Sequence, residues 1–181
     1  MKLKPKSSTD HEGMSVKILK NVSTKLASPL AIIVNQSLNS GIVPQALKVS
    51  KVTPVFKKND NTLCDNYRPI ALLPTISKIL EKIVHKQLIT YLINSKLLFN
   101  SQHGLRQNHS TETATLEFID KILKHLDNNE TPVSIFLDLT KAFDTLNHDI
   151  LLYKLSCYGI HNTALDWFNS YLSQRYQYVE Y

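Results

Sequence analysis

The chain has 181 residues, 43% of them hydrophobic and 20% charged, which suits one folded domain with a core and excludes a wholly disordered, collagenous or coiled-coil protein. Its net charge of +6 is divided unevenly, because residues 1–109 hold 16 Lys and Arg against 5 Asp and Glu, and residues 110–181 hold 5 against 10. The basic half indicates a polyanionic partner and the acidic half could hold cations, although a solvated surface accounts for the same pattern.

Hydrophobic spacing predicts a helix and then a hairpin after a polar N-terminal tail. Apolar residues recur at helical spacing from Leu26 to Leu38, and Gly41 follows where a helix would end. Two extended segments, residues 49–56 and 67–73, flank the turn-like residues 59–61 and predict a basic hairpin. Pro54 would confine the first strand to a sheet edge, because proline cannot donate to a second neighbour.

The next part of the chain predicts two helices separated by a linker. The first begins at Pro74 and runs to about residue 92, and the linker covers residues 94–109. Ser110 or Thr111 would cap the second helix, which should end near Asp127. The expected buried face of this second helix consists of Leu116, Ile119, Ile122, Leu123 and Leu126.

One buried strand and two short helices complete the expected elements. Residues 133–137 are rich in β-favouring side chains and give the strongest prediction of a buried strand in the chain. Helices are expected around residues 150–157 and 164–172, the latter capped by Asn162 or Thr163, and the chain then becomes extended at Tyr176, Tyr178 and Val179. The sequence stops in that extended segment, so we expect a truncated or artificial boundary.

Asp138 is the first candidate for chemistry, because it follows the predicted buried strand. A carboxylate at such a strand end is costly unless it is compensated, and a bound cation would compensate it. A helix cap or a surface ion pair explains the same residue. Asp144, six residues later, could cap the next helix or pair with a lysine.

Three blocks of sequence resemble reverse transcriptases of non-LTR (LINE-type, Jockey-like) retrotransposons. Residues 138–148, Asp-Leu-Thr-Lys-Ala-Phe-Asp-Thr-Leu-Asn-His, resemble the first catalytic block of that family. Residues 66–74 with 78–82 resemble its first fingers block, and residues 102–106 with Ser110 and Thr111 resemble its second. The blocks occur in the family's order, and the resemblance covers about residues 40–181.

The resemblance implies an α+β fold, with mainly helical fingers and an incomplete palm of a right-hand polymerase. Residues 1–40 would precede the polymerase core, residues 41–130 would form the fingers-like region, and residues 131–181 the incomplete palm. The implied activity is RNA-directed DNA polymerisation by two-metal nucleotidyl transfer with Mg²⁺. The implied partners are an RNA template, a DNA primer and deoxynucleoside triphosphates.

The resemblance also implies roles for particular residues. Asp138 would be the catalytic carboxylate and a metal ligand, and the carbonyl of Leu139 would contact the second ion. Phe143 would exclude a ribose hydroxyl as a steric gate. The implied nucleotide-binding residues are Lys57, Lys58, Arg68, Thr140, Lys141, Ala142 and Phe143, and the implied template-binding residues are Gln102, Gly104 and Arg106.

Departures from the family pattern leave a second interpretation open. The chain contains neither a Pro-Gln-Gly block nor an Asp-Asp pair, so its catalytic carboxylates are incomplete and we expect no activity from it alone. The alternative is a non-catalytic, nucleic-acid-binding remnant of a decayed element. We expect an intracellular location, cytoplasmic or nuclear, because Cys64 and Cys157 show no disulfide pattern and no signal peptide or membrane span is recognisable.

Overall fold

The chain folds as two compact units, described here by a computed structural model that covers residues 9–10, 12–139 and 142–179. One unit comprises residues 1–86 and 147–181, and the other comprises residues 87–146. The boundary falls within helix α3 (Thr75–Asn94), so its last turns belong to the second unit. Within the described ranges, no helix combines the length and the apolar character needed to cross a bilayer.

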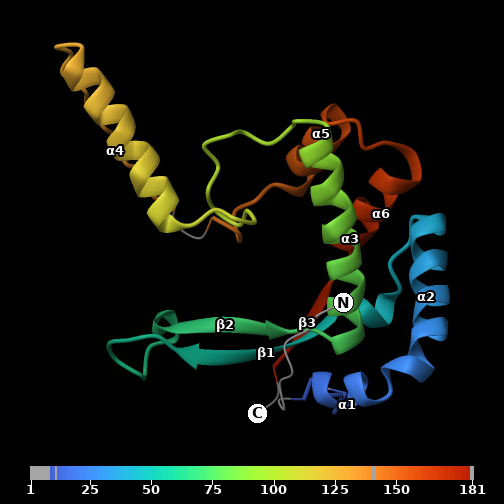
Figure 1. Ribbon diagram of the computed structural model, residues 1–181. Helices are drawn as coiled ribbons and strands as arrows, with labels where there is room; N and C mark the ends of the chain where they lie inside the picture. The colour runs from blue at the N-terminus through green and yellow to red at the C-terminus, as the bar shows by residue number, and fades with distance from the viewer. Residues whose placement is uncertain (1–8, 11, 140–141, 180–181) are drawn as a thin grey trace. The chain divides into compact units, whose positions relative to one another are not determined.

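The first unit contains most of the helices that the structure describes (Figure 1). Besides the start of α3 they are α1 (Val16–Asn21), α2 (Ser23–Ser40), α5 (His148–Cys157) and α6 (Asn162–Leu172). The end of α2 confirms the expectation from Gly41, which adopts a left-handed conformation with φ 69°. A Cβ added there would lie 3.0 Å from Asp166 Cβ and from the Thr163 carbonyl oxygen of α6. Glycine therefore permits both the turn and the close approach to α6.

Three strands form the sheet of this unit in the order β2-β1-β3. Strand β1 (Val49–Phe56) pairs antiparallel with β2 (Tyr67–Leu72), which confirms the hairpin, and parallel with β3 (Tyr176–Tyr178). Short 3-10 helices at Gln45–Lys48 and Cys64–Asn66 precede β1 and β2. The pairing with β3 joins the C-terminal segment to the hairpin.

Pro54 does not confine β1 to an edge, because β1 is the middle strand of the sheet. The β3 pairing covers residues 49–51 of β1, so among the described residues it stops before Pro54. On the other side Pro54 lies opposite Pro69. In the same register Lys57 lies opposite Asn66, and the Lys57 N–H donates to the Asn66 carbonyl at 2.8 Å, so these two residues form a hydrogen-bonded pair. Hydrogen-bonded and non-hydrogen-bonded pairs alternate along an antiparallel ladder, so Pro54 and Pro69, three positions away, form a non-hydrogen-bonded pair. Neither proline therefore interrupts the ladder.

Helices α2, α3 and α6 enclose the hydrophobic core of the first unit. Its buried members are Val34, Val43, Leu80, Val84 and Trp167. The Trp167 indole N–H donates to Ser37 Oγ at 3.0 Å, and that hydroxyl donates to the Ile42 carbonyl at 2.7 Å. The polar edge of the buried indole is thus satisfied by α2, which fixes the register between α2 and α6.

A second polar contact joins α3 to α6. The Tyr171 hydroxyl donates to Glu81 Oε1 at 2.8 Å, and Arg175 lies over the Tyr171 ring at 4.7 Å. Burial, together with the nearby Glu81 carboxylate, raises the pKa of Tyr171 to about 12. The hydroxyl therefore remains a donor throughout the physiological pH range.

Asp10 closes the N-terminus of α3 from a distant part of the sequence. Its Oδ2 accepts the buried Thr75 N–H at 2.6 Å, and its Oδ1 accepts the N–H groups of Met14 at 2.9 Å and Glu12 at 3.1 Å. Burial opposes ionisation of this carboxyl, but the hydrogen bonds from Thr75, Met14 and Glu12 outweigh it and hold the pKa of Asp10 below its usual value. The segment predicted as a polar tail therefore caps a helix 65 residues away.

In the second unit, α4 (Thr111–Asp127) forms as predicted but does not bury its apolar face. Ser110 is its N-cap and exchanges hydrogen bonds with Thr113 in a capping box. No residue of α4 is buried, and the expected core positions include the exposed Leu116, Ile119, Leu123 and Leu126. The prediction of a buried face was wrong because a helical period shows which face is apolar without supplying an element to cover it.

The expected strand at residues 133–137 was also wrong. This segment has no regular secondary structure and pairs with no strand, and Val133, Ile135, Phe136 and Leu137 are all at least 80% exposed. A strand with apolar side chains on both faces needs sheet neighbours and covering layers. The strands of the described chain pair with one another instead.

The helix starts differ in how well sequence predicted them. Asp144 does not cap α5, because the N-cap of this helix is Asn147, which accepts the Ile150 N–H at 3.0 Å. Neither Asn162 nor Thr163 caps α6, because the helix begins at Asn162 and its N-cap is His161, without a side-chain hydrogen bond. Asn162 itself has a φ of 52°, in the left-handed region.

Candidate nucleic-acid and nucleotide site

The hairpin presents predicted nucleotide-binding residues on one face. Arg68 lies opposite Val55 in the register, and Lys57 follows Val55 by two residues, so Lys57 and Arg68 point to the same side of the ladder. Both side chains are exposed, as is Lys58 in the turn that follows. The structure therefore places Lys57 and Arg68 on one face of the hairpin.

Hydrogen bonds within the hairpin tip order the turn between these cations. Asp60 Oδ1 accepts both the N–H and the hydroxyl of Thr62, at 2.8 and 2.7 Å. Asn66 Nδ2 donates to the Asp60 carbonyl at 2.6 Å, and the Tyr67 hydroxyl donates to the Asn61 carbonyl at 2.8 Å. The Thr62 hydroxyl and N–H lower the pKa of Asp60, so the acceptor remains ionised at neutral pH.

The predicted catalytic carboxylate lies in the second unit, in the irregular segment that follows α4. Asp138 and Leu139 are both exposed, and no strand holds them. In the ranges that the structure describes, no three His, Cys, Asp or Glu side chains gather as ligands for a metal ion. An Asp carboxylate and a Leu carbonyl offer the oxygen ligands that Mg²⁺ prefers, but one carboxylate does not fit a site for two ions. The described residues thus supply part of a metal site at most.

Phe143, the predicted steric gate, is 84% exposed. The ring therefore does not pack in the hydrophobic core of the described residues. Ala142 is described nearby in the chain and is exposed. Thr140 and Lys141, the other two predicted triphosphate-binding residues, lie outside the described residues.

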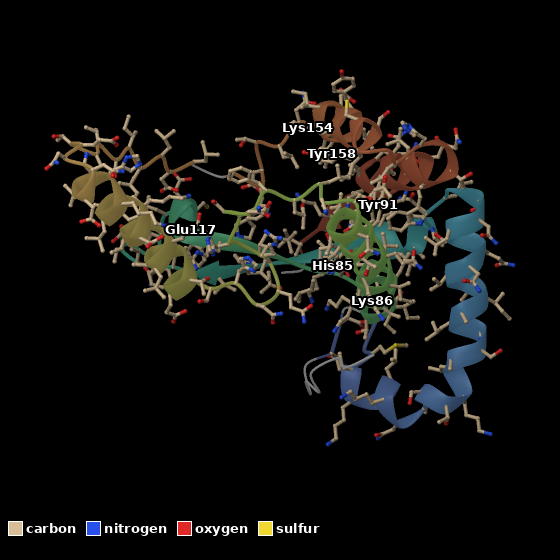
Figure 2. The ribbon with its side chains drawn as sticks, turned by 45° about the horizontal axis from the view of Figure 1, so that its top comes forward. His85, Lys86, Tyr91, Glu117, Lys154 and Tyr158 are labelled. Carbon is tan, nitrogen blue, oxygen red and sulfur yellow. The ribbon has the colours of Figure 1, made fainter. Side chains whose placement is uncertain are left out.

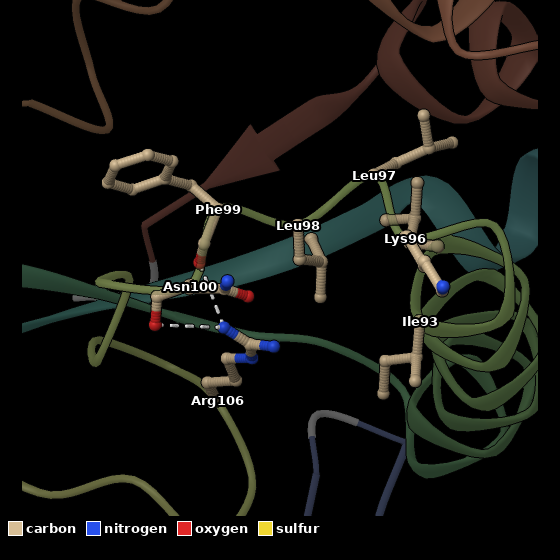
Figure 3. A pocket seen from close by; sticks show the side chains of 8 residues that line it. Ile93, Lys96, Leu97, Leu98, Phe99, Asn100 and Arg106 are labelled. Carbon is tan, nitrogen blue, oxygen red and sulfur yellow. Dashed lines mark hydrogen bonds between the residues drawn. The ribbon is translucent and has the colours of Figure 1, made fainter.

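The predicted template-binding residues lie together in the loop before α4. Arg106 donates from one guanidinium nitrogen to the carbonyls of Phe99, at 2.9 Å, and Asn100, at 3.4 Å (Figure 3). The Gln102 N–H donates to the same Phe99 carbonyl at 3.1 Å. Gly104 has open space around it, with no atom within 4 Å of the position of an added Cβ. The loop is therefore ordered by its own backbone contacts and leaves Gly104 accessible.

Sequence reasoning missed the role of His103 in the same loop. Its Nε2 lies 2.7 Å from Glu117 Oε2 and its Nδ1 lies 3.0 Å from Thr113 Oγ1, both on α4. Figure 2 shows Glu117 on that helix, where it also contacts Ser101 and binds Lys121 at 2.6 Å. Lys121, Ser101 and His103 together lower the pKa of Glu117 to about 2. Of these contacts the sequence indicates only the ion pair of Glu117 and Lys121, because opposite charges four residues apart meet on the surface of a helix.

The predicted site residues are divided between the two units. Lys57, Lys58 and Arg68 belong to the first unit, and Asp138, Phe143 and Arg106 belong to the second. The structure thus groups the hairpin cations with one another and the loop residues with one another. The assignment of fingers and palm to these ranges stays a prediction.

Comparison with known proteins identifies the family of the chain. Residues 56–180, well over half of its length, match the family described as reverse transcriptase (RNA-dependent DNA polymerase). The chain is 35% identical over 126 residues to the RNA-directed DNA polymerase from mobile element jockey of Drosophila melanogaster, a match that covers 69% of the chain and 14% of that protein.

Two further relatives agree with this match. The jockey polymerase of Drosophila funebris is 29% identical over 154 residues, 84% of the chain and 17% of that protein. The probable RNA-directed DNA polymerase from transposon BS of Drosophila melanogaster is 30% identical over 138 residues, 76% of the chain and 15% of that protein. The chain thus spans about a sixth of the length of these relatives. It belongs to the reverse transcriptase family and is similar to the polymerases of non-LTR retrotransposons.

Proposed function

We propose that this chain forms the fingers and the first part of the palm of a retrotransposon RNA-directed DNA polymerase. The observation that carries the proposal is the common face of Lys57 and Arg68 on a hairpin whose tip is ordered by its own hydrogen bonds. Such a pair suits the phosphates of an incoming nucleotide, because a guanidinium can bind two oxygens at once. The family membership supplies the polymerase context.

In this proposal the template is RNA, the primer is DNA and the substrates are deoxynucleoside triphosphates. Asp138 would contribute one oxygen ligand for Mg²⁺, and the exposed Phe143 ring would lie against the sugar and exclude a ribose 2′ hydroxyl. The further carboxylates would come from the Asp-Asp turn that follows this block in the family. The location would be intracellular, cytoplasmic or nuclear.

The binding half of the proposal is tested with the 181-residue chain itself. Lys57, Lys58 and Arg68 are changed together to Glu, and RNA binding is measured by fluorescence anisotropy over a range of salt concentrations. If the hairpin contacts phosphates, the plot of log binding constant against log salt concentration becomes less steep in the variant. Its slope should become less negative by about 2 for single strands and by about 3 for a duplex.

The matched control is the same triple reversal at Lys78, Lys82 and Lys86, which lie at helical spacing on α3. It should weaken RNA binding less than the hairpin reversal. The opposite order would move the nucleic-acid surface from the hairpin to α3, and binding that does not change with salt would remove the electrostatic account.

The catalytic half is tested in a complete polymerase, for example the jockey enzyme carrying residues 56–180 of this chain. Asp138→Asn should lower the rate of the chemical step by several orders of magnitude and leave template binding nearly unchanged. Phe143→Val should raise ribonucleotide use relative to deoxyribonucleotide use, by on the order of 1 to 3 kcal/mol. Asp144→Asn is the control, since Asp144 is an exposed carboxylate close to Phe143 in the sequence and Asn147, not Asp144, caps α5, so its loss should spare the choice of sugar.

The alternative, a nucleic-acid-binding remnant without catalysis, gives a different set of results. It predicts the same salt-dependent binding by the hairpin but no polymerisation in the chimaeric enzyme. An unchanged ribose to deoxyribose ratio of kcat/KM in Phe143→Val would also contradict the assignment of the residues after Asp138.

A further inference from the structure

A pocket of about 590 Å³ lies between the end of α3 and the loop that follows it, entirely within the second unit. Its lining includes Ile93, Lys96, Phe99, Asn100 and Arg106. Figure 3 shows Arg106 and Asn100 on one side of this hollow and Ile93 and Lys96 on the other. The volume falls in the range of small-ligand sites in proteins.

The turn that ends α3 builds one wall of the pocket. Lys96 has a left-handed φ of 54°, its N–H donates to the Ile93 carbonyl at 3.0 Å, and the Leu97 N–H donates to the Leu92 carbonyl at 3.0 Å. These two bonds form a Schellman motif, in which glycine is the usual residue at the left-handed position. A lysine in this place carries its cation to the rim of the pocket.

Arg106 builds the opposite wall. One of its nitrogens is held by the carbonyls of Phe99 and Asn100, and the described residues offer no partner to its other N–H groups. The lining of the pocket contains Lys96 and Arg106 and no Asp or Glu. The pocket is therefore positively charged, with guanidinium donors still available for a phosphate.

Phe99 adds an aromatic surface at the rim. Its side chain is 74% exposed, although its own carbonyl is tied to Arg106 and to the Gln102 N–H. An exposed ring on an ordered backbone, in a segment that also carries two cations, has the composition of single-strand binding surfaces, in which bases stack on aromatic side chains and cations neutralise phosphates.

We infer that this pocket binds one unstacked nucleotide of single-stranded RNA, with its base on Phe99 and its phosphates at Lys96 and Arg106. The inference rests on the proposed function, which makes the strand the template. It adds Lys96 and Phe99 to the template-binding residues, and it limits the pocket to single strands because a base paired in a duplex cannot stack on Phe99.

The test measures binding of the 181-residue chain to an RNA of about ten nucleotides, single-stranded or annealed to its complement, by fluorescence anisotropy. Phe99→Leu should weaken single-strand binding by at least about fivefold and leave duplex binding unchanged. Lys96→Gln should reduce the salt slope for the single strand by about 0.7. The controls are Tyr153→Leu, another exposed aromatic residue, and Lys25→Gln, another exposed lysine, and neither should change binding.

Three results would overturn the inference. The first is that Phe99→Leu binds single-stranded RNA as tightly as the unchanged chain does, and the second is that Phe99→Leu and Tyr153→Leu weaken binding equally. The third comes from repeating the measurement with single-stranded DNA of the same sequence, if Phe99→Leu weakens binding of the DNA and not of the RNA. If Phe99→Leu leaves single-strand binding unchanged while the reversal of Lys57, Lys58 and Arg68 weakens it, the pocket assignment fails and the proposed function stands. If the unchanged chain binds no RNA at low salt, both fail.

Discussion

Replacing Asp10 by Ala should destabilise the first unit although the residue lies outside every helix and strand. The change leaves the buried Thr75 N–H without its acceptor and also removes the acceptor for Met14 and Glu12. An unsatisfied buried N–H costs about 1–3 kcal/mol, so we expect a loss of roughly 2 kcal/mol in the free energy of unfolding. For a chain of this size, that corresponds to a fall of about 4–8 °C in Tm.

The pH dependence of this loss follows from the lowered pKa of Asp10. Because the folded-state pKa lies below the ordinary value of 3.8, the carboxylate stabilises the fold above that pH, and the contribution disappears as pH falls through the folded-state pKa. The difference in unfolding free energy between the unchanged chain and Asp10→Ala should therefore be constant near neutral pH and shrink in acid. Asp10→Asn, which cannot ionise, should remove this pH dependence.

Urea unfolding followed by circular dichroism measures both effects. Asp65→Ala is the control, because Asp65 is an exposed carboxylate in the 3-10 helix Cys64–Asn66 and takes no part in the contacts of Asp10, and it should leave the unfolding midpoint unchanged. Equal midpoints for Asp10→Ala and the unchanged chain at pH 7, or a difference that persists undiminished into acid, would refute the capping role.

Four further outcomes test the fold and the site. Gly41→Ala should destabilise by about 1–3 kcal/mol more than Gly13→Ala in urea unfolding, because both glycines have positive φ but only Gly41 meets a neighbouring helix. Tyr171→Phe should cost about 1–2 kcal/mol in the same assay, since the hydroxyl donated to Glu81 is lost. The Glu117 carboxyl should titrate by NMR with a pKa of about 2, below its ordinary value of 4.5. The stabilisation from its contacts is therefore fully present above pH 4.5 and is lost as the pH falls through about 2. The 181-residue chain alone should show no primer extension with Mg²⁺ or Mn²⁺, and incorporation above a heat-treated control would contradict the incomplete set of carboxylates.

Local signals in the sequence predicted the elements whose ends depend on neighbouring residues. Gly41 ends α2 because only a residue tolerant of positive φ can close that helix, and Ser110 starts α4 because its hydroxyl accepts an otherwise free N–H. The hairpin follows equally from alternating side chains around a turn, and with it the common face of Lys57 and Arg68. The blocks that identify the family are likewise a property of the sequence.

Tertiary structure decided which apolar surfaces are covered and which distant polar groups meet. The period of α4 and the β-favouring residues 133–137 both indicated burial, yet both remain exposed because burial requires a partner element that a local pattern cannot specify. Asp10 meets Thr75, and His103 meets Glu117, only through the folded path of the chain. The pocket beside Arg106 also depends on the fold, because the end of α3 and the loop that follows it together form its walls. No single sequence motif specifies how these two segments lie against each other.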